Sequence, residues 1–161
     1  MFKFKNRNFL FILSMILFFS LFSYFTSFVE AKAEGDVAKA VSVEKIFEIY
    51  SKGDSFFVDA RAFKEYKKGH IEGAINIPYH SDKKEEYILK AIDMLNGAKY
   101  VVVYCDGSGC DLSKMLAKDL VNAGLKKEKL IVFTEGFNLW EKKGFPVSKD
   151  LSFQKVLFSQ E

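Results

Sequence analysis

Short apolar runs alternate along this chain with longer segments in which apolar residues recur every three or four positions. The runs at residues 55–60, 100–104 and 130–133 are rich in β-branched and aromatic residues, which is typical of buried strands. Helical spacing is found at residues 41–50, 61–68, 81–96, 113–121 and 137–142. This alternation predicts an α/β fold with a central, mainly parallel sheet flanked by helices on both faces.

The start of the chain has a different pattern. Lys3, Lys5 and Arg7 precede an uncharged run over residues 9–29, which is long enough to span a bilayer. The small residues of Ala31-Lys32-Ala33 then match a cleavage site. We therefore predict a hydrophobic signal peptide or uncleaved anchor helix over residues 1–33, with cleavage favoured, and a tether over residues 34–40. The basic end stays in the cytoplasm, so the remainder is predicted to be exported and to contact the membrane only through this segment.

The net charge of the chain falls to zero once residues 1–33 are left out of the count. The chain has 24 basic and 21 acidic residues, and residues 1–33 hold four of the bases and one of the acids, which leaves 20 of each. The neutral remainder has no electrostatic footprint for nucleic acid. Its length is typical of one domain, predicted at residues 41–149. Residues 150–161 are predicted to be a peripheral tail with a helical turn near residues 153–158.

Several local interactions are predicted around these elements. Ser42 and Ser113 are the expected N-caps of the helices at 41–50 and 113–121. Arg61 and Glu65 stand four apart and are placed to form an ion pair on a helix. No second His or Cys lies near His70 at a metal-ligand spacing, so a structural, hydrogen-bonding histidine is predicted there.

Cys105 is the residue with the strongest chemical signal. It ends the apolar run at 100–104 and precedes a loop that contains Gly107 and Gly109 and then leads into a helix. At such a position the backbone N–H groups and the helix dipole favour the thiolate, which is the nucleophilic form. The alternative is a small buried cysteine with a packing role. The strand end and the two glycines favour the nucleophile.

Three blocks of sequence, spread over residues 41–147, resemble the rhodanese family. The first contains Asp59, Arg61, Glu65, Tyr66, Gly69, His70, Ile71, Gly73, Ala74, Asn76, Ile77 and Pro78. The second is the strand that ends in Cys105, where that family keeps its catalytic cysteine. The third contains Gly136, Trp140, Gly144, Pro146 and Val147. With no internal repeat, the chain looks like a single rhodanese-like domain.

The resemblance implies a sulfurtransferase in which Cys105 attacks a donor such as thiosulfate or polysulfide, becomes a persulfide, and passes the sulfur to a thiol or cyanide. It implies no metal and no organic cofactor. The expected partners are a small sulfur-containing substrate or a thiol-bearing acceptor protein. The backbone of the following loop would bind the substrate, and a second group of residues would support the site structurally. The loop residues are Asp106, Gly107, Ser108, Gly109, Cys110 and Asp111, and the supporting residues are Asp59, Arg61, Glu65 and His70.

The loop departs from the common family pattern because it carries Asp106 and Asp111 and no Lys or Arg before Lys114. Two carboxylates beside the site are expected to raise the pKa of the thiol and to repel a doubly negative donor. Efficient turnover of thiosulfate is therefore not expected. The loop also resembles a subset of rhodanese-like domains with a Cys-x-Gly-x-x-Cys arrangement. A related phosphatase is disfavoured, since phosphate recognition would require an Arg in the loop.

Cys110, the only other cysteine, leaves three interpretations open: a resolving thiol, a ligand contact in the pocket, and a small loop-filling residue. The predicted function has alternatives as well. The leading hypothesis is an exported sulfurtransferase that uses Cys105. The others are a periplasmic thiol-disulfide redox module that uses Cys105 and Cys110, and a non-catalytic rhodanese-like binding domain.

Overall fold

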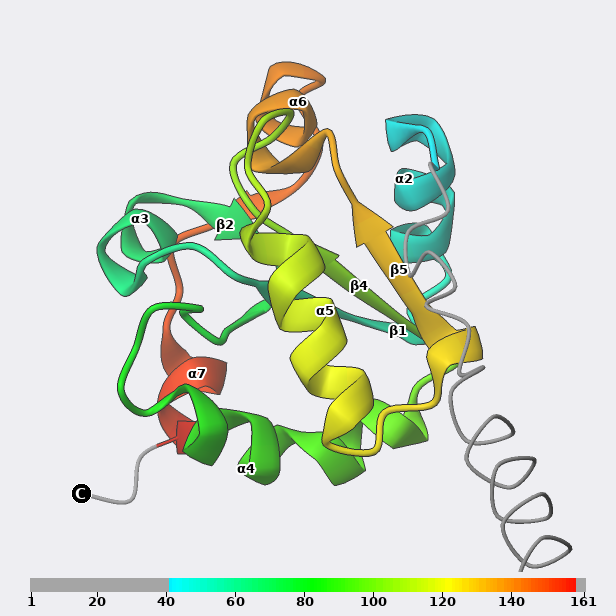
Figure 1. Ribbon diagram of the computed structural model, residues 1–161. Helices are drawn as coiled ribbons and strands as arrows, with labels where there is room; N and C mark the ends of the chain where they lie inside the picture. The colour runs from blue at the N-terminus through cyan, green and yellow to red at the C-terminus, as the bar shows by residue number, and fades with distance from the viewer. Residues whose placement is uncertain (1–40, 159–161) are drawn as a thin grey trace, which may run out of the picture. The chain divides into compact units, whose positions relative to one another are not determined.

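A parallel sheet runs through residues 41–158, the part of the chain that the computed structural model describes (Figure 1). Its strand order is β3 (Ile75–Asn76), β1 (Ser55–Asp59), β4 (Tyr100–Tyr104) and β5 (Leu130–Phe133). Val103 of β4 pairs with Val58 of β1 and with Val132 of β5. Because all pairs in this sheet are parallel, the carboxyl ends of the strands meet at one edge.

Helices cover both faces of the sheet, as predicted. One face packs against α4 (Lys84–Gly97), α5 (Leu112–Asn122) and α7 (Ser152–Phe158), and the other against α2 (Val43–Ser51) and α6 (Gly136–Lys142). Along β4, Val101 and Val103 belong to the first core, whereas Val102 and Tyr104 belong to the second. The remaining elements are α3 (Phe63–Lys68), η1 (Lys127–Lys129) and an antiparallel pair of short strands, β2 (His70–Ile71) and β6 (Val147–Ser148).

The predicted export segment and tether lie outside the described residues. Within residues 41–158, no helix has the length and apolarity needed to cross a bilayer. The predicted helical cap Ser42 is confirmed at the first described helix, where its side chain accepts a hydrogen bond from the Lys45 backbone N–H at 3.4 Å.

The prediction that Ser113 is an N-cap is wrong. Helix α5 begins at Leu112, with Asp111 at the N-cap position and no side-chain cap. The carbonyl of Asp111 accepts the N–H of Met115 at 3.0 Å, which starts the helix earlier than the apolar spacing indicates. Ser113 therefore lies in the first turn of α5, where it is fully buried beside Cys105.

The predicted ion pair between Arg61 and Glu65 is also wrong. Helix α3 begins at Phe63, so Arg61 lies outside it. The Arg61 guanidinium instead points into the protein and pairs with Asp59, a fully buried carboxylate that requires a countercharge. Glu65 pairs with Lys68 at 2.9 Å on the surface.

The C-terminal segment is more integrated than the peripheral tail that the sequence predicts. The helical turn becomes α7, and its Gln154 is buried. The Gln154 side chain accepts the backbone N–H of Asn76 at 2.7 Å and donates to the backbone carbonyl of Asn76 at 2.9 Å. One polar side chain thus satisfies the free edge of β3, which apolar periodicity does not reveal.

Candidate active site

Cys105 lies directly after β4, at the carboxyl end of the sheet, and is fully buried. Its thiol donates a hydrogen bond to the carbonyl oxygen of Cys110 at 3.2 Å, and its Sγ lies 3.5 Å from the Ser113 hydroxyl. The intervening residues, 106–111, connect β4 to α5, and we name them the catalytic loop after the predicted role of Cys105. The sulfur therefore lies at the base of this loop, with both ends of the loop around it.

Burial raises the pKa of the Cys105 thiol from 9.0 to about 11. The neighbouring Cys110 side chain acts in the same direction, whereas the Ser113 hydroxyl and backbone N–H lower the pKa. The expectation that this position favours the thiolate is therefore not met. The pKa is raised, but through burial and Cys110 rather than through Asp106 and Asp111, the loop acids from which we expected the rise. The thiol is protonated at neutral pH.

The two acidic loop residues each have a basic neighbour. The Asp106 carboxylate lies 3.7 Å from the Arg61 guanidinium, and the Asp111 carboxylate lies 2.9 Å from the Lys114 ammonium. Arg61 comes from the end of β1, and Lys114 from the first turn of α5. Lys114 therefore offsets the charge of Asp111, whereas the single charge of Arg61 is shared between Asp106 and the buried Asp59.

Helix α6 holds the start of the catalytic loop through its backbone. Phe137 N–H donates to the carbonyl of Cys105 at 2.8 Å, and Asn138 N–H donates to the carbonyl of Asp106 at 2.9 Å. This close approach requires a glycine at position 136, where φ is +64° and a Cβ would lie 2.5 Å from the Cys105 carbonyl oxygen. The sequence marked Gly136 only as part of the family resemblance, without this reason.

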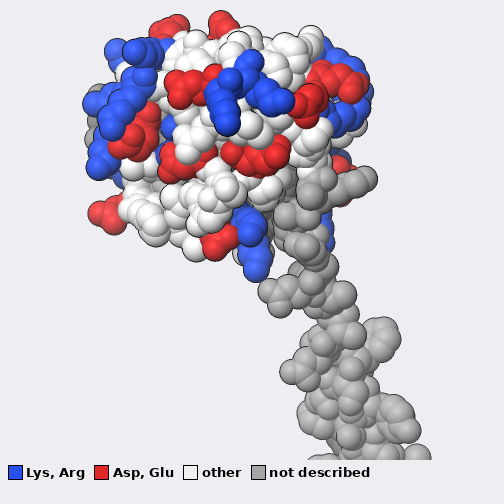
Figure 2. Space-filling model, turned by 90° about the horizontal axis from the view of Figure 1, so that it is seen from above, with Lys and Arg blue, Asp and Glu red and all other residues white. Residues whose placement is uncertain are grey.

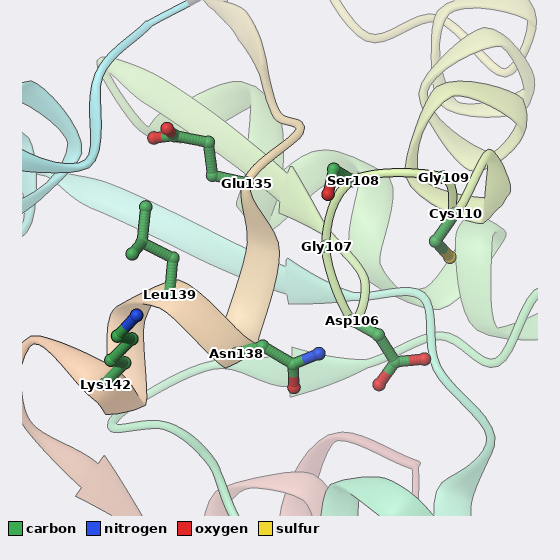
Figure 3. Close-up of a pocket in the computed structure, with 9 residues that line it drawn as sticks. All are labelled: Asp106, Gly107, Ser108, Gly109, Cys110, Glu135, Asn138, Leu139 and Lys142. Carbon is green, nitrogen blue, oxygen red and sulfur yellow. The ribbon is translucent and has the colours of Figure 1, made fainter.

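A pocket of about 620 Å³ opens between the catalytic loop and α6 (Figure 3). The loop contributes residues 106–110, and the other wall consists of Glu135, Asn138, Leu139 and Lys142. Cys110 lines this pocket and is half-buried, whereas Cys105 is fully buried and is not among the lining residues. Sequence reasoning missed the α6 wall, for which the only signal was its position next to Gly136.

Basic and acidic side chains are interspersed over the face of the domain seen in Figure 2. The pocket itself has a mixed character, with the carboxylates of Asp106 and Glu135 and the ammonium of Lys142. Glu135 also accepts the backbone N–H of Val43 at 3.1 Å, which ties the pocket wall to the start of α2. The pocket therefore presents both signs of charge to a ligand.

Comparison with known proteins identifies the family. A model of the rhodanese-like domain matches residues 42–143. The chain belongs to the rhodanese-like family. Its catalytic loop and pocket lie within the matched residues, so the site just described is a feature of this rhodanese-like domain.

The curated proteins that are similar in sequence to this rhodanese-like protein differ from one another in their named functions. An HTH-type transcriptional regulator of Mycobacterium tuberculosis is 28% identical over 115 residues, which is 71% of this chain and 47% of the regulator. A tRNA uridine(34) hydroxylase of Salmonella newport is 38% identical over 80 residues, which is 48% of this chain and 21% of the hydroxylase. The chain thus spans less than half the length of these curated relatives.

Among solved structures, the thiosulfate sulfurtransferase from Pseudomonas aeruginosa has a similar fold, with a TM-score of 0.54 and 22% sequence identity. The alignment covers 69% of this chain and 20% of that chain. This likeness shows the rhodanese-like fold.

The buried ion pair of Asp59 and Arg61 is connected to the catalytic loop of this rhodanese-like domain through Asp106. The Arg61 guanidinium pairs with Asp59 at 2.6 Å, donates to the Gly69 carbonyl at 2.8 Å, and lies 4.1 Å from the centre of the Phe137 ring. Burial raises the pKa of Asp59, and the guanidinium opposes that rise. Arg61 thereby connects the end of β1 with α6 and, through Asp106, with the loop.

The structure gives the other two supporting residues separate surroundings. Glu65 is on α3 and pairs with Lys68. His70 is buried, its Nδ1 lies 2.9 Å from the Tyr66 carbonyl, and its ring stacks on the Tyr66 ring at 3.8 Å. These contacts agree with a structural histidine. Over residues 41–158, His, Cys, Asp and Glu side chains form no cluster of three or more that could hold a metal ion.

Proposed function

We propose that this rhodanese-like protein is an exported sulfurtransferase that carries sulfur as a persulfide on Cys105. The observation that carries the proposal is the placement of this thiol at the end of β4, at the base of a loop that opens into a pocket. Strand-end nucleophiles at the carboxyl edge of a parallel sheet face the ligand crevice. Membership of the rhodanese-like family and the fold of the thiosulfate sulfurtransferase support the same reaction class.

The proposed reaction begins with attack of the Cys105 thiolate on the outer sulfur of the donor. With thiosulfate, an S–S bond forms on Cys105, the S–S bond of the donor breaks, and sulfite leaves with the electron pair. An acceptor, either a thiol or cyanide, then takes the outer sulfur and returns Cys105 as the thiolate. The same steps apply to polysulfide, from which a shorter polysulfide leaves.

Deprotonation is the demanding step of this reaction, because the pKa of Cys105 is raised to about 11. The Cys110 carbonyl binds the protonated thiol, and Ser113 is the neighbour that stabilises the thiolate. The catalytic loop does not form a complete cradle around the sulfur, since the N–H of Cys110 donates to the Gly107 carbonyl at 3.0 Å. We expect donor binding to open this turn and free its N–H for the anion.

The test is the intact mass of the full-length protein in mild detergent after exposure to thiosulfate or polysulfide. We expect a gain of one sulfur atom that a reductant removes and that Cys105→Ser abolishes, while the circular dichroism spectrum is unchanged. Sulfur loading of Cys105→Ser at the wild-type rate would contradict the proposal. A binding domain without catalysis predicts no modification by either donor, with partner capture that survives this substitution.

Export is the second part of the proposal and rests on the sequence of residues 1–33. Fusion of residues 1–40 to a reporter enzyme that matures only outside the cytoplasm tests it. We expect an active reporter, and loss of activity when charged residues interrupt the apolar run at 9–29. An inactive fusion would place the domain in the cytoplasm.

A thiol-disulfide redox module is the second candidate function, because the Cys105 thiol donates a hydrogen bond to the Cys110 backbone carbonyl, which brings the two cysteines together. This function requires oxidation of both thiols without a sulfur donor. Exposure to a glutathione redox buffer, followed by alkylation of the remaining thiols, tests it. Cys110→Ala would then abolish the formation of an internal disulfide.

A further inference from the structure

Two thiols with very different exposure lie next to each other in the active site. Cys105 is fully buried, whereas Cys110 is half-buried and lines the pocket. The Cys105 thiol donates to the backbone carbonyl of Cys110 at 3.2 Å, and Cys110 contributes to the raised pKa of the Cys105 thiol. They are the only cysteines in the chain.

The catalytic loop folds Cys110 back over Cys105 by a tight turn. The N–H of Cys110 donates to the carbonyl of Gly107 at 3.0 Å, and Gly109, with φ at +90°, supplies the backbone conformation between them. The Cys110 carbonyl thus lies against the buried sulfur, and the Cys110 side chain is half-buried at the pocket. Figure 3 shows Cys110 on the side of the loop that leads into α5.

We propose that Cys110 resolves the Cys105 persulfide by attacking its inner sulfur, so that a Cys105–Cys110 disulfide forms and hydrosulfide is released. This inference rests on the proposed function, which supplies the persulfide. The bond between the two persulfide sulfurs breaks, and its electron pair leaves with the outer sulfur. The outer sulfur gains two electrons, and the two cysteine sulfurs together lose them. The proton of the Cys110 thiol goes to solvent, and a dithiol reductant must later reopen the disulfide.

The identity of the leaving group favours attack on the inner sulfur. Attack on the outer sulfur would expel the Cys105 thiolate, whose pKa is raised by burial, and thiolates of high pKa leave slowly. Attack on the inner sulfur expels hydrosulfide, a weaker base that escapes into the adjacent pocket. Burial of Cys105 also hinders direct access of an external thiol to its inner sulfur. The internal thiol therefore competes well with external thiols for that sulfur.

The other two roles of Cys110 make a different prediction. If Cys110 only contacts the ligand or fills the loop, the persulfide on Cys105 persists until an acceptor arrives. The fate of the loaded sulfur in the absence of any acceptor thus separates a resolving thiol from both.

The experiment uses the full-length protein, reduced, freed of small thiols, and exposed to benzenethiosulfonate, a singly charged sulfane-sulfur donor. Benzenesulfinate release measures loading, sulfide release measures resolution, and intact mass without reductant identifies the protein product. The isosteric Cys110→Ser variant keeps the loop and the nucleophile but lacks the second thiol. Cys105→Ser is the control for loading at the other thiol.

For the wild type we expect one sulfide for each sulfinate and a final mass two hydrogens below that of the dithiol. For Cys110→Ser we expect a stable gain of one sulfur for each sulfinate released, and a ratio of sulfide to sulfinate at least about tenfold lower than in the wild type. A persistent persulfide on the wild type, without sulfide, would overturn the inference and leave the proposed function intact. Absence of loading in Cys110→Ser would place Cys110 in the loading step and overturn the inference alone, whereas wild-type loading in Cys105→Ser would overturn both.

Discussion

Two ion pairs flank the catalytic loop, and each joins an Asp to a basic side chain. One pair is buried and the other is exposed to solvent. Asp59 and Arg61 pair at 2.6 Å with side chains 0% and 5% exposed, whereas Asp111 and Lys114 pair at 2.9 Å with side chains 65% and 50% exposed. The buried pair also binds Gly69 and stacks on Phe137. The comparison shows that burial and additional contacts, and not the presence of an Asp–base pair, decide which interaction organises the site.

Arg61→Ala is the substitution from which we expect the largest loss of stability. It leaves Asp59 buried without a countercharge and removes the connection to α6, so we expect the free energy of unfolding to fall by about 3–5 kcal/mol. Urea denaturation followed by Trp140 fluorescence measures it. Arg61→Lys keeps the charge but not the planar group, and should recover only part of the loss. A loss below about 1 kcal/mol in Arg61→Ala would show that the buried pair is no more important than a surface pair.

Gly136→Ala tests the second buried attachment of the loop. A Cβ at this position would meet the Cys105 carbonyl and would have to adopt φ of +64°, so we expect a loss of about 2–4 kcal/mol together with impaired persulfide loading. Gly53→Ala is a matched control, because Gly53 has φ of +68° and open space around it. That control should cost about 1 kcal/mol and leave loading unchanged. Equal effects of the two substitutions would argue against the close contact.

Ser113→Ala tests whether a buried neighbour sets the pKa of the Cys105 thiol. The Ser113 hydroxyl lowers the pKa of Cys105, so its removal should shift the pH profile of thiol alkylation further upward. In a Cys110→Ser background we expect the iodoacetamide rate at a fixed pH below 11 to fall roughly threefold to tenfold. The exposed loop serine Ser108 provides the control variant Ser108→Ala, whose profile should match the parent. An unchanged profile in Ser113→Ala would remove Ser113 from thiolate stabilisation.

Lys114→Ala should have the smallest effect. Its pair with Asp111 is exposed and screened by solvent, so we expect the free energy of unfolding to change by less than about 1 kcal/mol, with a smaller change at high salt. The same urea titration measures it beside Arg61→Ala. A loss comparable with that of Arg61→Ala would mean that the outer pair also organises the loop.

Much of the fold was predictable because the strands β1, β4 and β5 are short apolar runs and the helices have regular apolar spacing. The predicted position of Cys105 at a strand end is confirmed for the same reason. The partner of Arg61 was mispredicted, since spacing along a helix says nothing of a buried carboxylate on a neighbouring strand end. The α6 wall of the pocket was not predicted at all, because no local pattern distinguishes Asn138 and Lys142 from other surface residues.

The order of the elements, the family and the position of Cys105 at a strand end were therefore predictable from the sequence alone, because all three depend on local patterns. The surroundings of Cys105 could be seen only in the tertiary structure. They are the burial that raises its pKa, the position of Ser113 beside its sulfur, and the close approach of Gly136 to its carbonyl. The tertiary structure also decided that Gln154 satisfies the edge strand at Asn76, 78 residues away. The physical reason is that burial and long-range hydrogen bonds depend on which distant segments meet, and periodicity reports only on neighbours along the chain.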